Sequence, residues 1–210
     1  MRVKVCFIGL VALAATGCFP QKAPHRPITA VTLENATTLA ATVEFLDLHG
    51  KPFESLPADM SNFKALSQLS LREAGLASLP ESVNTIAGPL TWVDLGENKF
   101  SAFPDPALLA RIKTLYLSDN ALTNLPAAIG GLTQLTYLNL DRNQIETLPV
   151  EIGNLSSLAF LRLNGNKLTA LPESIGNLKN LKRLYLKGNP LPDAEKARLK
   201  TLLPQAELLF

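Results

Sequence analysis

The sequence predicts an α/β solenoid, in which a right-handed coil carries a parallel β-sheet on its concave side and short helical or irregular turns on its convex side. Three observations predict it. Leucine accounts for 41 of the 210 residues. The apolar motif Leu-x-x-Leu-x-Leu recurs seven times, at steps of 22 to 24 residues. An asparagine and a Leu-Pro or Phe-Pro pair follow the motif in most repeats. A fixed period of this length is typical of folds whose units pack on their neighbours.

The composition excludes several classes of protein. Hydrophobic residues make up 47% of the chain and charged residues 18%, with 15 prolines and 12 glycines. Neither a disordered chain nor a charged coiled coil has this composition. Without Arg2 and Lys4, 18 basic residues balance 18 acidic ones. The overall charge therefore predicts no nucleic-acid partner.

The N-terminus has the plan of an export signal, which we assign to residues 1–17. Two cations precede an apolar stretch of 11 residues, 5–15, whereas a transmembrane helix needs about 20. The small residues that lead into Cys18 resemble the bacterial lipobox. That resemblance implies cleavage before Cys18 and lipid attachment to it, and several acyl chains would anchor the chain durably. The alternative is an ordinary signal cut near Ala15.

Between the signal and the repeats, two further segments are expected. Residues 18–27 contain three prolines, which deny helix and sheet their amide donors, so this segment is predicted to be an extended tether. Residues 28–42 mix apolar and polar residues without a full repeat and are expected to cap the first coil at its N-terminal end.

Seven repeats are expected over residues 43–192. Because side chains alternate along a strand, the two outer residues of each Leu-x-Leu triplet point to one side and the core, and the residues beside them point to solvent. Each chain turn returns to begin an equivalent strand, so the strands should be parallel. The motifs begin at Val43, Leu66, Leu90, Ile112, Leu135, Leu158 and Leu181.

These repeats resemble the leucine-rich repeat family, whose members form horseshoe-shaped solenoids. In that family the recurring asparagines form a hydrogen-bonded ladder inside the coil. The first two repeats have Lys51 and Ala74 at the equivalent position, so we expect the ladder to begin in the third repeat and the first two to be packed more loosely. The asparagines are Asn98, Asn120, Asn143, Asn166 and Asn189.

The turns and the C-terminal end follow from local signals. Proline after the strand favours a short helical turn, and three repeats continue with Ile-Gly-x-Leu. The repeat that contains Pro104 has a second proline and one residue fewer, which predicts an irregular turn. Residues 193–210 are expected to close the core with a helix that Asp193 caps and that runs to Leu203, followed by a strand over 206–210.

No spacing typical of a catalytic or metal site occurs, so we expect a non-enzymatic protein without a cofactor or metal. Asp47, His49 and Ser70 are predicted to lie near one another, but an open sheet offers no oxyanion site or substrate pocket. The acidic residues Asp94, Glu97 and Asp119 lack the spacing of a calcium loop, so solvated carboxylates are the more probable interpretation.

The concave face is the candidate binding site, because it has most of the large aromatic residues that the leucine core does not use. Exposed aromatics favour recognition, although rings also stack along a sheet without any binding role. Acidic residues precede basic ones along this face, which would orient a partner of opposite charge order. The predicted contact residues are Phe45, Trp92, Asp94, Tyr116, Asp119, Tyr137, Phe160, Arg162, Arg183 and Tyr185.

The sequence therefore predicts an exported, lipid-anchored bacterial protein that binds a protein or peptide through its concave face, as a monomer. Phe19 after Cys18 resembles lipoproteins of the outer membrane, which favours that membrane or the cell surface. Two alternatives remain. One is a structural spacer of the envelope. The other is an intracellular scaffold for small-GTPase signalling, because the Ile-Gly-x-Leu turns resemble that class of repeats.

Overall fold

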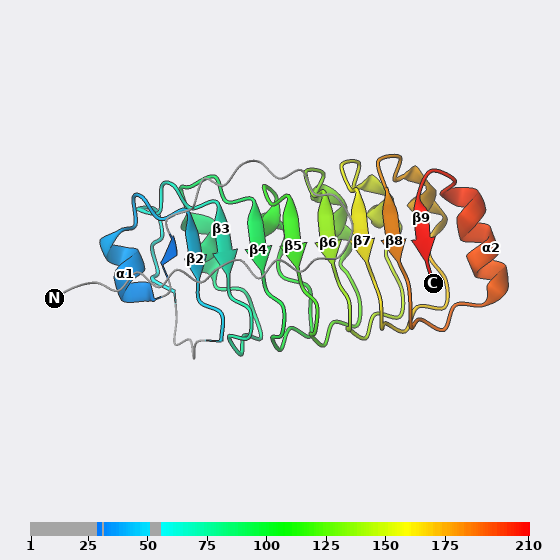
Figure 1. Ribbon diagram of the computed structural model, residues 1–210, viewed down its shortest axis with the longest axis horizontal. Coiled ribbons are helices and arrows are strands. Elements are labelled where there is room, and N and C mark those ends of the chain that lie inside the picture. Colours follow the sequence, from blue (N-terminus) through cyan, green and yellow to red (C-terminus); the bar gives the residue numbers. More distant parts are fainter. Residues whose placement is uncertain (1–28, 31, 51–55) are drawn as a thin grey trace.

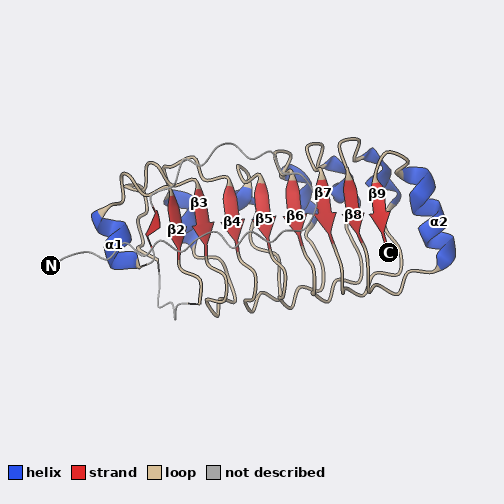
Figure 2. Cartoon of the chain, viewed as in Figure 1, coloured by secondary structure: helices blue, strands red, loops and turns tan. Residues whose placement is uncertain are grey.

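The computed structural model describes residues 29–30, 32–50 and 56–210. Within them, nine strands form one parallel sheet in which each strand pairs with its neighbours in sequence. Figures 1 and 2 show these strands side by side along an elongated molecule, with the short helical turns behind the sheet and an α-helix at each end. The predicted solenoid is confirmed. Cys18, Lys51, the predicted signal and tether, and residues 28 and 31 of the predicted N-terminal cap lie outside the described residues.

Seven of the strands are the seven predicted motifs. The central apolar residue of each strand aligns with that of the next, as Leu138 does with Leu161. Two further strands extend the sheet at its ends: β9 lies inside the predicted closing strand, whereas β1 was not predicted. The strands are β1 (Thr29–Ala30), β2 (Phe45–Asp47), β3 (Gln68–Ser70), β4 (Trp92–Asp94), β5 (Thr114–Tyr116), β6 (Tyr137–Asn139), β7 (Phe160–Arg162), β8 (Arg183–Tyr185) and β9 (Glu207–Leu209).

The convex side consists of five single 3-10 turns, each of which follows a proline or begins with one. Proline fixes its own φ and has no amide to leave unsatisfied at the start of a turn. The C-terminal helix α2 was predicted with Asp193 as its N-cap, and this was wrong. Asp193 is the first helical residue, and its carboxylate accepts a hydrogen bond from Lys196 at 2.9 Å. The helical elements are α1 (Leu33–Thr38), η1 (Glu81–Thr85), η2 (Pro106–Leu109), η3 (Ala127–Gly131), η4 (Val150–Asn154), η5 (Glu173–Asn177) and α2 (Asp193–Leu202).

One continuous core fills the space between the sheet and the turns. The leucines of the repeats are almost fully buried, and Phe63 and Phe100 add the largest buried side chains. Ala36 of α1 and Leu199 of α2 are completely buried at the two ends, where each helix covers apolar side chains that would otherwise face water. Among the described residues, every buried side-chain nitrogen or oxygen has a hydrogen-bond partner.

The Ile-Gly-x-Leu motif has a packing role that the sequence did not reveal. A Cβ added at Gly153 would lie 2.3 Å from the carbonyl oxygen of Ser174 in the next turn, and one added at Gly130 would lie 2.9 Å from Cβ of Glu151. Only glycine permits such close approach of backbone to backbone. The motif therefore lets η3, η4 and η5 stack tightly.

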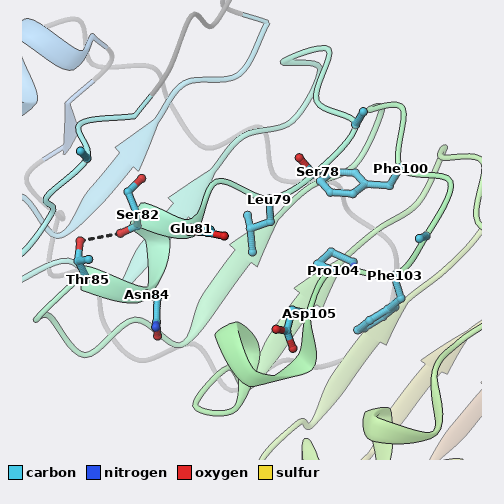
Figure 3. A pocket seen from close by; sticks show the side chains of 13 residues that line it. Ser78, Leu79, Glu81, Ser82, Asn84, Thr85, Phe100, Phe103, Pro104 and Asp105 are labelled. Carbon is cyan, nitrogen blue, oxygen red and sulfur yellow. Dashed lines mark hydrogen bonds between the residues drawn. The ribbon is translucent and has the colours of Figure 1, made fainter.

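The two turns without this glycine stack less tightly. Between η1 and the segment that leads into η2 lies an open cavity of about 590 Å³. Figure 3 shows Leu79, Phe100, Phe103 and Pro104 beside the polar side chains of η1. The turn that contains Pro104 and Pro106 was predicted to be irregular, and this was wrong. Residues 106–109 form the 3-10 helix η2, which the Asp105 carboxylate caps by accepting the amide of Ala107 at 2.9 Å.

Candidate functional site

The concave face is covered by five aromatic side chains that form a continuous ridge. We call Phe45, Trp92, Tyr116, Tyr137 and Phe160 the aromatic ridge. Successive ring centroids are 5.9, 5.6, 5.0 and 6.2 Å apart, in tilted or edge-to-face contacts. These distances are within the range in which aromatic pairs stabilise one another.

Strand register explains how the ridge crosses the sheet. Tyr137 and Phe160 are direct lateral neighbours. Trp92 and Tyr116 lie on adjacent strands two positions apart, so the ridge steps diagonally between the two outward rows of the sheet. Phe45 reaches Trp92 across β3, which has Gln68 between them in the register. The five side chains are half-buried, so stacking covers part of each ring and leaves part exposed.

Beyond the ridge, an arginine is held in a fixed position. The Arg162 guanidinium lies over the ring of Tyr185, 4.6 Å from its centroid, and its Nε and Nη2 atoms lie 2.7 Å from Oδ2 of Asp141. Partial burial of Arg162 acts against its charge, but the hydrogen bonds to Asp141 outweigh it, and the pKa of the guanidinium is raised. A third of the side chain stays exposed, so a fixed cation faces solvent.

Most charged side chains of this face form ion pairs across one repeat step, which the sequence analysis did not foresee. Arg72 contacts Glu97 and, at 3.8 Å, Asp94. Arg142 binds Asp119 through two hydrogen bonds. The same spacing joins Arg183 to Glu207 and His49 to Glu73, at 2.7 and 3.4 Å. Pairs with this exposure contribute about 1 kcal/mol or less to stability.

The pKa values of two predicted contact carboxylates are shifted in opposite directions. Burial raises the pKa of Asp94, although the Gly96 amide at 2.8 Å and Arg72 both stabilise its charged form. The hydrogen bonds from Arg142 lower the pKa of Asp119, which partial burial would otherwise raise. Hydrogen bonding therefore stabilises the charged form of Asp119, whereas burial acts against the charged form of Asp94.

The five asparagines lie beneath this face and tie consecutive repeats together. In each, Nδ2 donates to backbone carbonyls of its own and the preceding repeat, and Oδ1 accepts an amide of the preceding repeat. Asn143, for example, donates to the carbonyl of Leu117 at 2.9 Å and accepts from the amide of Leu122 at 3.1 Å. The corresponding bonds begin at Asn98, which accepts the amide of Ala74 at 3.1 Å.

The residue before each ladder position has a positive φ throughout the seven repeats. Three repeats have glycine there, which adopts this conformation freely. The four central repeats have charged residues instead, at some cost in backbone energy. The row is Gly50, Glu73, Glu97, Asp119, Arg142, Gly165 and Gly188.

The polar trio of Asp47, His49 and Ser70 does not have the geometry of a catalytic triad. The Asp47 carboxylate accepts the backbone amide of His49 at 3.1 Å, and the imidazole Nε2 lies 3.4 Å from Glu73. Ser70 is buried. A nucleophile requires a base that takes its proton, and here the imidazole faces a different carboxylate.

Two features are absent from the described residues. In that part of the chain, no group of three or more His, Cys, Asp or Glu side chains is placed to hold a metal ion. None of the helices it contains is long and apolar enough to cross a membrane.

Part of the repeat region matches a known family model. Residues 115–203 match the family model of a leucine-rich repeat region. Over 109 residues, about half of the chain, the sequence is 34% identical to the Arabidopsis thaliana Protein SUPPRESSOR OF npr1-1, CONSTITUTIVE 1. The chain spans only 7% of the length of that curated relative.

Solved structures with the same architecture come from bacteria and plants. A leucine-rich repeat protein of Leptospira interrogans is 31% identical, with a TM-score of 0.54 over 86% of this chain and 58% of that one. An internalin of Listeria monocytogenes is 21% identical, with a TM-score of 0.68 over 82% and 49%, and shows the fold alone. The leucine-rich repeat ectodomain of the Arabidopsis thaliana receptor kinase GASSHO1/SCHENGEN3, solved in complex with CASPARIAN STRIP INTEGRITY FACTOR 2, is 28% identical, with a TM-score of 0.59 over 79% and 20%.

Proposed function

We propose that this chain, whose fold is that of the leucine-rich repeat solenoids, recognises a protein or peptide through its concave face without catalysing a reaction. The aromatic ridge is the observation that carries the proposal. Five large rings are kept half-exposed on a molecule whose core is made of leucine. Half-exposed aromatic side chains, held in place by one another, present contact area with little entropy left to lose on binding.

Similar solenoids support this proposal by example. The plant receptor ectodomain that shares the fold was solved in complex with CASPARIAN STRIP INTEGRITY FACTOR 2. Since that protein is much longer than this chain, the likeness supports the class of function and leaves the ligand open. No enzyme family is indicated by the repeat model.

The proposal is tested by truncating the ridge at two points. Trp92→Ala with Tyr137→Ala should weaken binding of any concave-face ligand at least a hundredfold, because each truncated anchor residue costs about 2 kcal/mol or more. Binding of peptides selected on the wild-type chain is measured by fluorescence anisotropy, with circular dichroism to check the fold. As a matched control, Val150→Ala removes an exposed apolar side chain from the convex side. Unchanged binding in the double variant would remove the concave face from consideration.

We further propose that the chain is exported and held at a bacterial envelope by lipid on Cys18. The support is the order of cations, apolar stretch and small residues before this cysteine. Intact mass of the membrane fraction is the measurement. It should give a chain that begins at Cys18 with acyl mass added, and Cys18→Ser should release the protein from the membrane. A mature chain that begins near residue 16 without added mass would contradict lipidation.

The alternatives make different demands on the same molecule. A structural spacer would retain its function after the ridge is truncated. An intracellular scaffold for small-GTPase signalling would require an unprocessed N-terminus, which the same mass measurement detects.

A further inference from the structure

Charge is distributed unequally along the concave face, and one of its ion pairs, Asp119 with Arg142, joins the two halves. Here the face comprises each strand and the two residues that follow the Leu-x-Leu triplet. From β2 to the turn after β5, it has five carboxylates against Arg72 alone, a net charge of −4 with His49 neutral. From β6 to β9, four cations oppose two carboxylates, a net charge of +2. The two groups are Asp47, Glu73, Asp94, Glu97 and Asp119 with Arg72, and then Arg142, Arg162, Arg183 and Lys187 with Asp141 and Glu207.

The contacts indicate that the acidic end is short of cations. Arg72 is shared between Asp94 and Glu97, so one guanidinium serves two carboxylates. Trp92 and Phe45 of the aromatic ridge lie among these groups. A basic side chain from a partner would supply the missing charge and could lie against a ring face, where cations are also stabilised.

Arg162 has the opposite character at the other end. The contacts to Asp141 employ its Nε and Nη2 atoms, and a guanidinium has five N–H donors, so donors remain for another acceptor. Because Tyr185 and Asp141 already fix the group, binding an anion there would cost little side-chain entropy. The arginine lies two residues beyond Phe160 on β7, at the end of the ridge.

This inference rests on the proposed function. The geometry points to an extended peptide segment that crosses the strands with its basic residues at one end and its acidic residue at the other. Basic side chains would lie over β2–β4, apolar or aromatic side chains on the aromatic ridge, and a carboxylate on Arg162. Asp94 and Arg162 are three strands apart, about 14 Å, which an extended chain covers in about four residues. The favoured ligand thus has a basic and an acidic residue about four positions apart, with apolar residues between them.

Trp92 allows the order to be measured, because it is the single tryptophan of the chain and lies at the acidic end. Twelve-residue peptides are selected from a random displayed library on the full chain, and those that Trp92→Ala with Tyr137→Ala no longer binds are kept. A nitroxide quencher is then attached to one end of each peptide or to the other. The basic end is expected to quench Trp92 fluorescence at least three times as strongly as the acidic end.

Arg162→Gln is the second measurement. It should weaken these peptides about tenfold, and the loss should vanish when the acidic residue of the peptide is replaced by glutamine. Lys200→Gln on α2 removes the same charge from an exposed position away from the sheet and should change nothing. Circular dichroism verifies that each variant is folded.

The outcomes separate the two proposals. The charge order is overturned if peptides that need the ridge quench Trp92 equally from both ends. It is also overturned if Arg162→Gln does not weaken their binding. Either result leaves concave-face binding in place. If no selected peptide depends on Trp92 and Tyr137, the proposed function itself fails.

Discussion

The N-terminal repeats, with strands β2–β4, and the C-terminal repeats, with β6–β8, have the same strands but differ in what joins one turn to the next. In the C-terminal repeats, each repeat has a ladder asparagine, and Gly153 lies where the turns η4 and η5 meet. The second repeat has Ala74 in place of the asparagine, and η1 and η2 leave a cavity between them. A regular leucine pattern thus builds the sheet in both regions, whereas the tightness of each coil depends on a few polar and small residues.

The largest expected loss of stability comes from removing a ladder asparagine in the C-terminal repeats. Asn143→Ala should lower the free energy of unfolding by about 3 kcal/mol, because it leaves buried backbone groups of two repeats without partners. Urea denaturation followed by circular dichroism measures this. Asn124→Ala, at an exposed position, is the control. A loss below about 1 kcal/mol would mean that the ladder does not account for the difference between the regions.

A smaller loss is expected from the glycine contact between turns. Gly153→Ala should destabilise the chain by about 2 kcal/mol, since the new methyl group would lie against the Ser174 carbonyl. The matched control is Gly131→Ala, where an added Cβ meets nothing within 4 Å and φ is not in the left-handed region. Thermal unfolding compares the two. Equal melting temperatures would show that the turns can separate without cost.

The smallest effect is a gain. Ala74→Asn should raise the free energy of unfolding by about 1 kcal/mol, because the new side-chain amide could donate to the backbone carbonyls that a ladder asparagine of the second repeat would bind. Hydrogen exchange should then slow in β2 and β3. In the wild-type chain these strands are expected to exchange faster than β6–β8. Equal protection of the two regions would contradict the looser packing predicted for the first repeats.

The repeat period predicted the sheet and its parallel register, because a leucine motif repeated seven times leaves one way to bury all its members. Local signals predicted the helix and the strand at the C-terminal end. The same register placed Tyr137 beside Phe160. β1 was missed because its two residues, Thr29 and Ala30, have no motif. The N-cap assignment of Asp193 failed because Pro192 had already fixed the backbone before the helix.

The sequence predicted which residues form the candidate site, but it predicted few of the contacts between them. Outward aromatics follow from the alternation of a strand, but the reach of Phe45 to Trp92 across β3 depends on side-chain rotamers. The ion pairs join residues 21 to 25 positions apart, such as Asp119 and Arg142. In sequence those charges look segregated by sign, and only the stacking of repeats shows that many neutralise a neighbour.

The row of positive φ angles implies that backbone stability and surface charge make opposite demands on the same residues. At Glu73, Glu97, Asp119 and Arg142, the backbone would accept glycine more readily than the side chain that is present. Replacing these residues with glycine would relieve the strain of the local backbone and remove four charges from the concave face. Stabilising the scaffold with the glycine that the outer repeats have at this position would therefore also change the charges that the concave face presents to a partner.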